Sequence, residues 1–161
     1  NTTDFLFPSN NYNSDEITCA IGLSVLKKLP IIIKRRDAIA KEIDRRLSSC
    51  EVVQPVNLRK KGIAPSIFFH TLKVDLKKIS VSKIKFAKAI ESEGIPINSD
   101  YRDITCEWKW IPKYVKNFKL TKNALNFRDE TFNLLLNEKY NNKDIIDIIN
   151  CIKKVESFYL K

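Results

Sequence analysis

The chain has 161 residues, of which 43% are hydrophobic and 30% are charged. This length and balance suit one globular domain, or two small lobes, with a real core, and they exclude a disordered chain. No apolar run approaches the roughly 20 residues that span a bilayer, and no signal peptide is recognised, so we expect a cytoplasmic protein with no membrane partner.

The chain is strongly basic, with 29 lysines and arginines against 19 acidic residues and a formal net charge of +10. Such an excess is compatible with a nucleic-acid or membrane partner. The lysines, however, are spread along the whole chain, often as pairs such as Lys27–Lys28 and Lys153–Lys154. This spread is typical of solvated helix faces, and it ranks nucleic-acid binding below the other interpretations.

Four cysteines, Cys19, Cys50, Cys106 and Cys151, are far apart and form no C-x-x-C pair. Neither a metal site nor redox chemistry is indicated, and we expect buried, reduced thiols. The chain begins with Asn and contains no Met, from which we expect it to be a piece of a longer protein.

The first helix is predicted after a polar loop that begins at Ser9. Asp15 and Glu16 suit a helix N-terminus, and apolar residues then recur at three- and four-residue spacing. Pro30 ends this helix or starts a second one, which we expect over 31–49. That second helix has an apolar side and a basic side, and the apolar side comprises Ile32, Ile39, Ile43 and Leu47.

Two basic residues on the second helix, Arg35 and Arg36, could form an anion site. On an exposed helix face, a solvated pair is the favoured interpretation.

Two strands are predicted next. The first, over 51–57, carries Pro55 and therefore suits a sheet edge. A basic loop over 58–65 leads to a strand over 66–75, which is rich in aromatic and β-branched residues. The only histidine, His70, lies in it and could act as a general base. Because no acid or nucleophile is patterned around it, we favour a histidine packed or half-exposed on the sheet.

A third helix is predicted to start from a cap at Ser80 or Ser82 and to run to about Glu93, with Gly94 ending it. An edge strand begins at 95–97.

The loop that follows this strand carries Tyr101 and Arg102. A guanidinium suits a carboxylate or phosphate, so Arg102 is a candidate for binding an anionic substrate. The alternative is a Tyr–Arg pair that makes only local contacts.

Trp108 and Trp110 alternate with Lys109 and Lys113 in the segment 107–114. Interleaved aromatic and basic residues could stack nucleobases. A short apolar anchor under a loop is the simpler interpretation.

The last part of the chain predicts a helix capped by Thr121, a strand over 131–137 and a terminal helix that starts at Asn142. The whole order of elements predicts an α/β (α+β) domain, in which a small, mainly antiparallel sheet is covered by helices.

Three segments resemble the DegT/DnrJ/StrS family of pyridoxal-phosphate (PLP) sugar aminotransferases. Asn11, Tyr12 and the run Cys19–Ala20–Ile21–Gly22 match the motif that begins the family's C-terminal domain. The Gly-Ile-Pro loop that ends at Tyr101 and the closing helix with Asp144 follow in the family's order.

The sequence departs from the family pattern at two positions in the first segment. Asn13 stands where the family usually has Arg, and Val25 stands where it usually has Gln.

The resemblance implies the small, C-terminal domain of a fold-type-I PLP enzyme. Residues 1–50 would form an interface loop and connecting helices, and residues 51–161 would form the small α/β domain. The large domain, which in the family holds the cofactor lysine and carboxylate, is absent from this chain. We therefore expect no catalytic residue here, no cofactor bound to the chain alone, and no activity of the chain alone.

The resemblance also implies roles for four residues. Asn11 would donate a hydrogen bond across a homodimer interface to the PLP phosphate of the partner subunit. Asn13 would be a weaker donor than the family's Arg. Tyr101 and Arg102 would contact the substrate.

The parent protein is thus expected to transfer an amino group from glutamate to a keto-sugar nucleotide in polysaccharide biosynthesis. One alternative is a non-catalytic binding or regulatory relative of the family. A less favoured alternative is a basic nucleic-acid-binding domain that uses Trp108 and Trp110.

Overall fold

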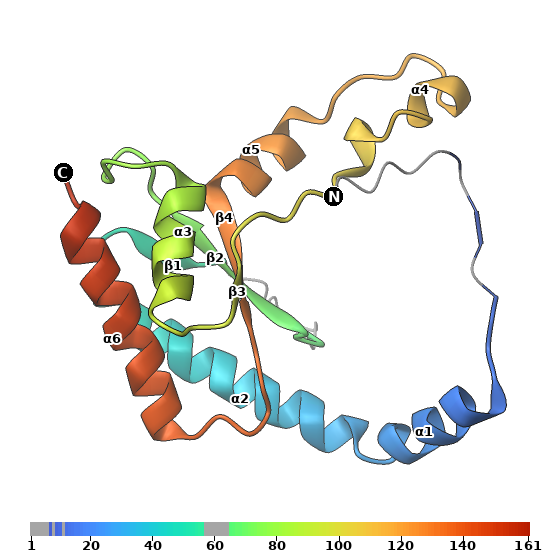
Figure 1. Ribbon diagram of the computed structural model, residues 1–161, viewed down its shortest axis with the longest axis horizontal. Coiled ribbons are helices and arrows are strands. Elements are labelled where there is room, and N and C mark those ends of the chain that lie inside the picture. Colours follow the sequence, from blue (N-terminus) through green and yellow to red (C-terminus); the bar gives the residue numbers. More distant parts are fainter. Residues whose placement is uncertain (1–6, 8, 11, 57–64) are drawn as a thin grey trace.

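The computed structural model describes residues 7, 9–10, 12–56 and 65–161, and Figure 1 shows their arrangement. Along the chain the elements are α1 (Glu16–Leu26), α2 (Leu29–Leu47), β1 (Val53–Pro55), β2 (Phe69–Val74), α3 (Lys83–Ser92), β3 (Ile97–Asn98), the 3-10 helix η1 (Thr105–Glu107), α4 (Ile111–Tyr114), α5 (Lys122–Glu130), β4 (Thr131–Leu135) and α6 (Asn142–Tyr159).

The four strands form one antiparallel sheet in the order β1-β2-β4-β3. In the centre of the sheet, His70 of β2 is paired with Leu134 of β4, and Leu134 is also paired with Ile97 of β3. The short strands β1 and β3 are therefore the edges, as predicted. Pro55 lies in β1, where the missing N–H costs no central ladder bond.

One face of this sheet packs against the helices α2, α3 and α6. Alternate strand residues such as Leu72, Phe132 and Leu134 are at most 1% exposed, whereas Lys73 and Leu135 on the other face are exposed. The hydrophobic core is the layer between the strands and the three helices. The predicted fold class, an α/β domain with a small helix-covered antiparallel sheet, is confirmed.

Local hydrogen bonds fix where the principal helices start. The side chain of Asp15 accepts from the N–H of Thr18, and that of Ser82 accepts from the N–H of Lys85. Asn141 and Asp144 form a reciprocal capping box at the start of α6. Each of these bonds satisfies a backbone donor that has no partner within the helix.

Helix α1 differs from α2, α3 and α6 because it buries none of its residues. It lies at the rim of the molecule, beyond the end of α2 and away from the sheet (Figure 1). The expectation of buried cysteines is consequently wrong for Cys19, which is exposed on α1. Cys50 and Cys106 are buried, Cys151 is half-buried, and all four are free thiols.

The segment before α5 contains two short helices that the sequence pattern did not predict, η1 and α4. Each of them buries one residue, Cys106 in η1 and Ile111 in α4, and neither residue belongs to the core between the sheet and the helices. Helix α5 starts directly after Thr121, as predicted, and runs to Glu130, where β4 follows without a loop. No helix within the described ranges is both long enough and apolar enough to traverse a lipid bilayer.

Candidate functional site

The loop between β3 and η1 presents Tyr101 and Arg102 at the end of the sheet. Tyr101 is 43% exposed, and its ring lies 6.2 Å from the ring of Phe69, the first residue of β2. The phenol is thus supported by the sheet on one side and open to solvent on the other. Its exposed side makes Tyr101 a candidate for contact with a ligand.

Arg102 makes a local ion pair on the same loop. Its Nε lies 2.6 Å from Asp100 Oδ2, while 70% of its side-chain surface stays exposed. The alternative of local contacts is therefore observed for Arg102, and anion binding stays a prediction. An exposed ion pair contributes little to stability, so Asp100 can be replaced by an incoming anion at small cost.

Lys83, on helix α3, binds this loop through a hydrogen bond. It lies in the first turn of α3, is 6% exposed, and donates from Nζ to the carbonyl of Ser99 at 2.9 Å. Its Nζ also lies 3.8 Å from Asp100 Oδ1. Burial lowers the pKa of the Lys83 ammonium, and the carboxylate of Asp100 opposes this shift. The buried ammonium thus fixes the backbone immediately before Tyr101.

Sequence reasoning missed Lys83 because lysines on an amphipathic helix are normally solvated. Every other described lysine is exposed. The signal that could have indicated Lys83 is its place directly after the cap residue, on the side of α3 that carries Phe86 and Ala87.

Aromatic residues and a cation extend the surface beside Tyr101. Phe68 is 72% exposed, and its ring lies 5.9 Å from that of Phe69. The guanidinium of Arg36 lies over the ring of Phe68, 5.9 Å from its centroid. Arg36 also donates to Glu138 Oε2 from Nε at 3.1 Å and from Nη2 at 2.9 Å. Backbone hydrogen bonding and the Arg36 guanidinium lower the pKa of Glu138.

The interpretation of Arg35 and Arg36 as a solvated pair is therefore wrong for Arg36, which is half-buried, whereas Arg35 is exposed as expected. Arg35 donates to the backbone carbonyls of Glu138 at 3.3 Å and Tyr140 at 3.0 Å. The two arginines join α2 to the turn before α6, a contact between segments about a hundred residues apart in the chain. Periodicity alone cannot show such a contact.

His70 belongs to the core face of the sheet and not to this surface. It is 2% exposed, and its Nε2 lies 2.6 Å from Asp44 Oδ1 on α2. The prediction of a packed histidine is confirmed. The acid beside it was not identified from the sequence, because 26 residues separate the two positions.

Of the two predicted cofactor-binding residues, the structure describes only Asn13. Asn11 is outside the described residues, and Asn13 is exposed on the segment that leads into α1. Figure 1 shows this segment and α1 far from the loop after β3. The structure therefore does not bring Asn13 together with Tyr101 and Arg102 within one chain.

The Trp108–Trp110 segment packs upon itself. The two indole rings are 5.7 Å apart, and Trp110 is 5.7 Å from Tyr114 in an edge-to-face arrangement. Both tryptophans are half-buried. This packing favours the apolar anchor over a platform for stacking nucleobases.

The residues present fit a partial contribution to a PLP site. Asn13 offers neutral amide donors, which suit a phosphate. Lys83 is the one described lysine shielded from water, and its amine is already engaged by the carbonyl of Ser99. Among the described residues, no group of three or more His, Cys, Asp or Glu side chains could hold a metal ion.

Comparison with known proteins relates most of the chain to one family of aminotransferases. The model of the DegT/DnrJ/EryC1/StrS aminotransferase family matches residues 2–153. The uncharacterized protein MJ1066 of Methanocaldococcus jannaschii is 25% identical over 150 residues, which is 91% of this chain and 38% of that protein.

Two solved structures have the same fold. The PLP form of the putative sugar aminotransferase Spr1654 from Streptococcus pneumoniae gives a TM-score of 0.75 at 19% identity over 98% of this chain and 40% of its own. Helicobacter pylori PseC, described as an aminotransferase involved in the biosynthesis of pseudoaminic acid, gives 0.74 at 19% identity over 93% of this chain and 39% of its own. The chain thus spans about two fifths of the length of these proteins.

Proposed function

Because the chain belongs to the DegT/DnrJ/EryC1/StrS aminotransferase family, we propose that it is the C-terminal domain of a PLP-dependent sugar aminotransferase. The parent enzyme transfers an amino group from glutamate to a keto-sugar nucleotide. The observation that carries this proposal is the family match across residues 2–153. The fold shared with sugar aminotransferases over nearly the whole chain supports it.

This chain supplies only some of the groups that would bind PLP in the parent protein. Bound PLP supplies the electron sink for amino transfer. The lysine and the carboxylate that hold it belong to the part of the parent protein outside this chain. Asn11 and Asn13 contribute neutral donors to the cofactor phosphate of the partner subunit in a homodimer. The apolar surface of α1, on which Ile17 is 74% and Ile21 61% exposed, supports an interface next to this segment.

Tyr101 and Arg102 bind the sugar nucleotide. The exposed guanidinium of Arg102 exchanges its carboxylate partner, Asp100, for an anionic group of the substrate. After the exchange, the buried ammonium of Lys83 still lies 3.8 Å from Asp100 Oδ1. The negative charge of Asp100 therefore remains compensated. Lys83 is accordingly a positioning residue, because it acts through the loop and through Asp100.

The test uses the full-length parent protein loaded with PLP. It is incubated with glutamate and a panel of keto-sugar nucleotides, and the amino-sugar product is detected by mass spectrometry. Arg102→Gln should raise KM for the sugar nucleotide about tenfold, with a smaller change in kcat, since it removes binding made in both ground and transition states. An unchanged KM would reject the role of Arg102.

A second measurement asks whether this chain alone holds the cofactor. The 161-residue chain alone is mixed with PLP, reduced with borohydride and digested for mass spectrometry. We expect no stoichiometric label on any lysine of this chain. A single labelled lysine would show that the cofactor is held here. A parent protein that binds PLP and transfers no amino group to any substrate would favour the regulatory relative.

A further inference from the structure

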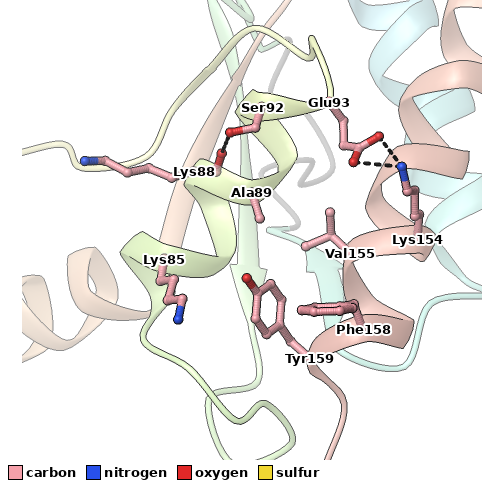
Figure 2. Close-up of a pocket in the computed structure, with 9 residues that line it drawn as sticks. All are labelled: Lys85, Lys88, Ala89, Ser92, Glu93, Lys154, Val155, Phe158 and Tyr159. Atoms are coloured by element: carbon pink, nitrogen blue, oxygen red, sulfur yellow. Dashed lines mark hydrogen bonds and ion pairs between the residues drawn. The ribbon is translucent and has the colours of Figure 1, made fainter.

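A groove between α3 and α6 lies apart from the residues discussed so far. It has a volume of about 560 Å³ and is lined by residues of α3 from Lys85 onward, by Glu93 directly after that helix, and by the last turns of α6. Figure 2 shows Ala89 and Val155 facing each other across it. A volume of this size suits a small organic ligand, since such pockets are typically about 300–1,000 Å³.

One end of the groove is closed by an ion pair between the two helices. The ammonium of Lys154 contacts the two carboxylate oxygens of Glu93 at 2.8 and 2.7 Å (Figure 2). This pair neutralises the carboxylate and raises the pKa of Lys154. The lysines that remain on α3, Lys85 and Lys88, therefore give the groove a positive balance.

The other end of the groove is aromatic. Phe158 is 77% exposed, and its ring packs edge-to-face on that of Tyr159 at 4.8 Å. A phenylalanine this exposed offers a bare ring face on which a planar group can stack. Figure 2 shows the hydroxyl of Tyr159 pointing toward α3, the helix that carries Lys85.

Within the described part of the chain, three polar groups of the groove make no hydrogen bond or ion pair: the ammoniums of Lys85 and Lys88 and the hydroxyl of Tyr159. Of these, the ammonium of Lys85 and the hydroxyl of Tyr159 lie on the groove side in Figure 2. Both are donors, and together they suit an oxyanion with several acceptor oxygens. The ammonium of Lys88 points away from the groove in Figure 2 and adds only long-range attraction.

We propose that this groove binds an aromatic monophosphate of the nucleoside monophosphate class. The base stacks on Phe158, and the phosphate accepts hydrogen bonds from Lys85 and Tyr159.

The test is an NMR titration of the 161-residue chain with adenosine monophosphate, followed through the backbone amides. We expect saturable shifts confined to Lys85, Phe158, Tyr159 and their neighbours, with a dissociation constant below about 1 mM. Adenosine and ribose phosphate, each carrying half of the ligand, should bind at least about tenfold more weakly, because each makes only one kind of contact. Equal binding by either half, or no localised shifts, would overturn the proposal.

Variants separate the two contacts. Lys85→Gln and Phe158→Ala should each weaken binding by about tenfold, and Phe158→Leu should behave like Phe158→Ala if the ring face matters. Lys143→Gln, at the far end of α6 with 85% of its side chain exposed, is the matched control and should bind as the wild type does. A Lys85→Gln chain with wild-type affinity would show an adventitious surface contact and reject the site.

Discussion

His70 Nε2 lies 2.6 Å from Asp44 Oδ1, and this contact joins the central strand β2 to helix α2 inside the hydrophobic core. The histidine is 2% exposed, whereas 22% of the Asp44 side chain remains exposed. The pair therefore spans from the core to its edge. The pair lies on the helix-covered face, away from Tyr101 and Arg102, so we expect it to stabilise the fold and not to contact the substrate.

Replacing Asp44 by Ala should destabilise the domain. The buried ring nitrogen of His70 would lose its partner, and an unsatisfied buried polar group costs about 1–3 kcal/mol. The free energy of unfolding, measured by urea denaturation, should fall by that amount. Asp147→Ala, on an exposed face of α6, should change it by less than about 0.5 kcal/mol. The double variant Asp44→Leu, His70→Leu should be less destabilised than the sum of its two single variants, because it leaves no unpaired polar group. A loss equal to that sum would contradict a coupled pair.

Replacing Lys83 by Met should loosen the loop that carries Tyr101. The variant removes the ammonium that donates to the carbonyl of Ser99 and keeps a similar apolar volume. Hydrogen–deuterium exchange of residues 99–102 should become faster, while the core strands keep their protection. Lys85→Met, two residues along and exposed, is the control. Equal exchange in wild type and Lys83→Met would show that the loop is held by other contacts.

The free energy of unfolding should fall in alkaline solution, because the thiol of Cys50 ionises more readily in the unfolded chain than in the folded one. Burial, and to a smaller extent the carboxylate of Glu156, raises the pKa of Cys50 from 9.0 to about 11. Between these values the unfolded chain loses a proton that the folded chain keeps, so the free energy of unfolding falls as pH rises. The loss across this window is on the order of 2 kcal/mol. Below pH 9.0 both states are protonated, and Cys50 adds no slope.

The measurement compares Cys50→Ala with wild type by urea denaturation at several pH values from neutral to alkaline. The variant should show a flatter decline over the alkaline window, whatever its stability at neutral pH. Cys19→Ala, at an exposed position on α1, should decline as the wild type does. Parallel declines of wild type and Cys50→Ala would contradict the assignment.

Helix α1 should tolerate charges on its apolar residues. Ile17 and Ile21 are 74% and 61% exposed, so Ile17→Lys and Ile21→Lys remove little buried area from the domain. The free energy of unfolding should stay within about 0.5 kcal/mol of wild type. Ile43→Lys on α2, where the side chain is 0% exposed, should instead prevent folding. A large loss from the α1 variants would show that this helix packs on the domain in solution.

The sequence by itself determined the elements whose signals are local. The caps at Asp15, Ser82 and Asn141 each involve a residue within one turn, and they begin their helices where the pattern predicted. Alternation and β-branched content likewise identified the strands, and the order of elements predicted the antiparallel, helix-covered sheet. The resemblance to the aminotransferase family was also visible, because its motifs follow one another along the chain.

The tertiary structure alone decided which distant residues meet. The pairs His70–Asp44 and Arg36–Glu138, and the contact of Lys83 with Ser99, depend on how α2, α3 and the loops pack on the sheet. For the same reason, Lys83 and the two arginines Arg35 and Arg36 contact specific groups, although the pattern assigned them to solvent. Periodicity reports which face of an element is apolar, but it does not report what lies opposite that face. That choice is made by packing, whose energy is summed over residues far apart in the chain.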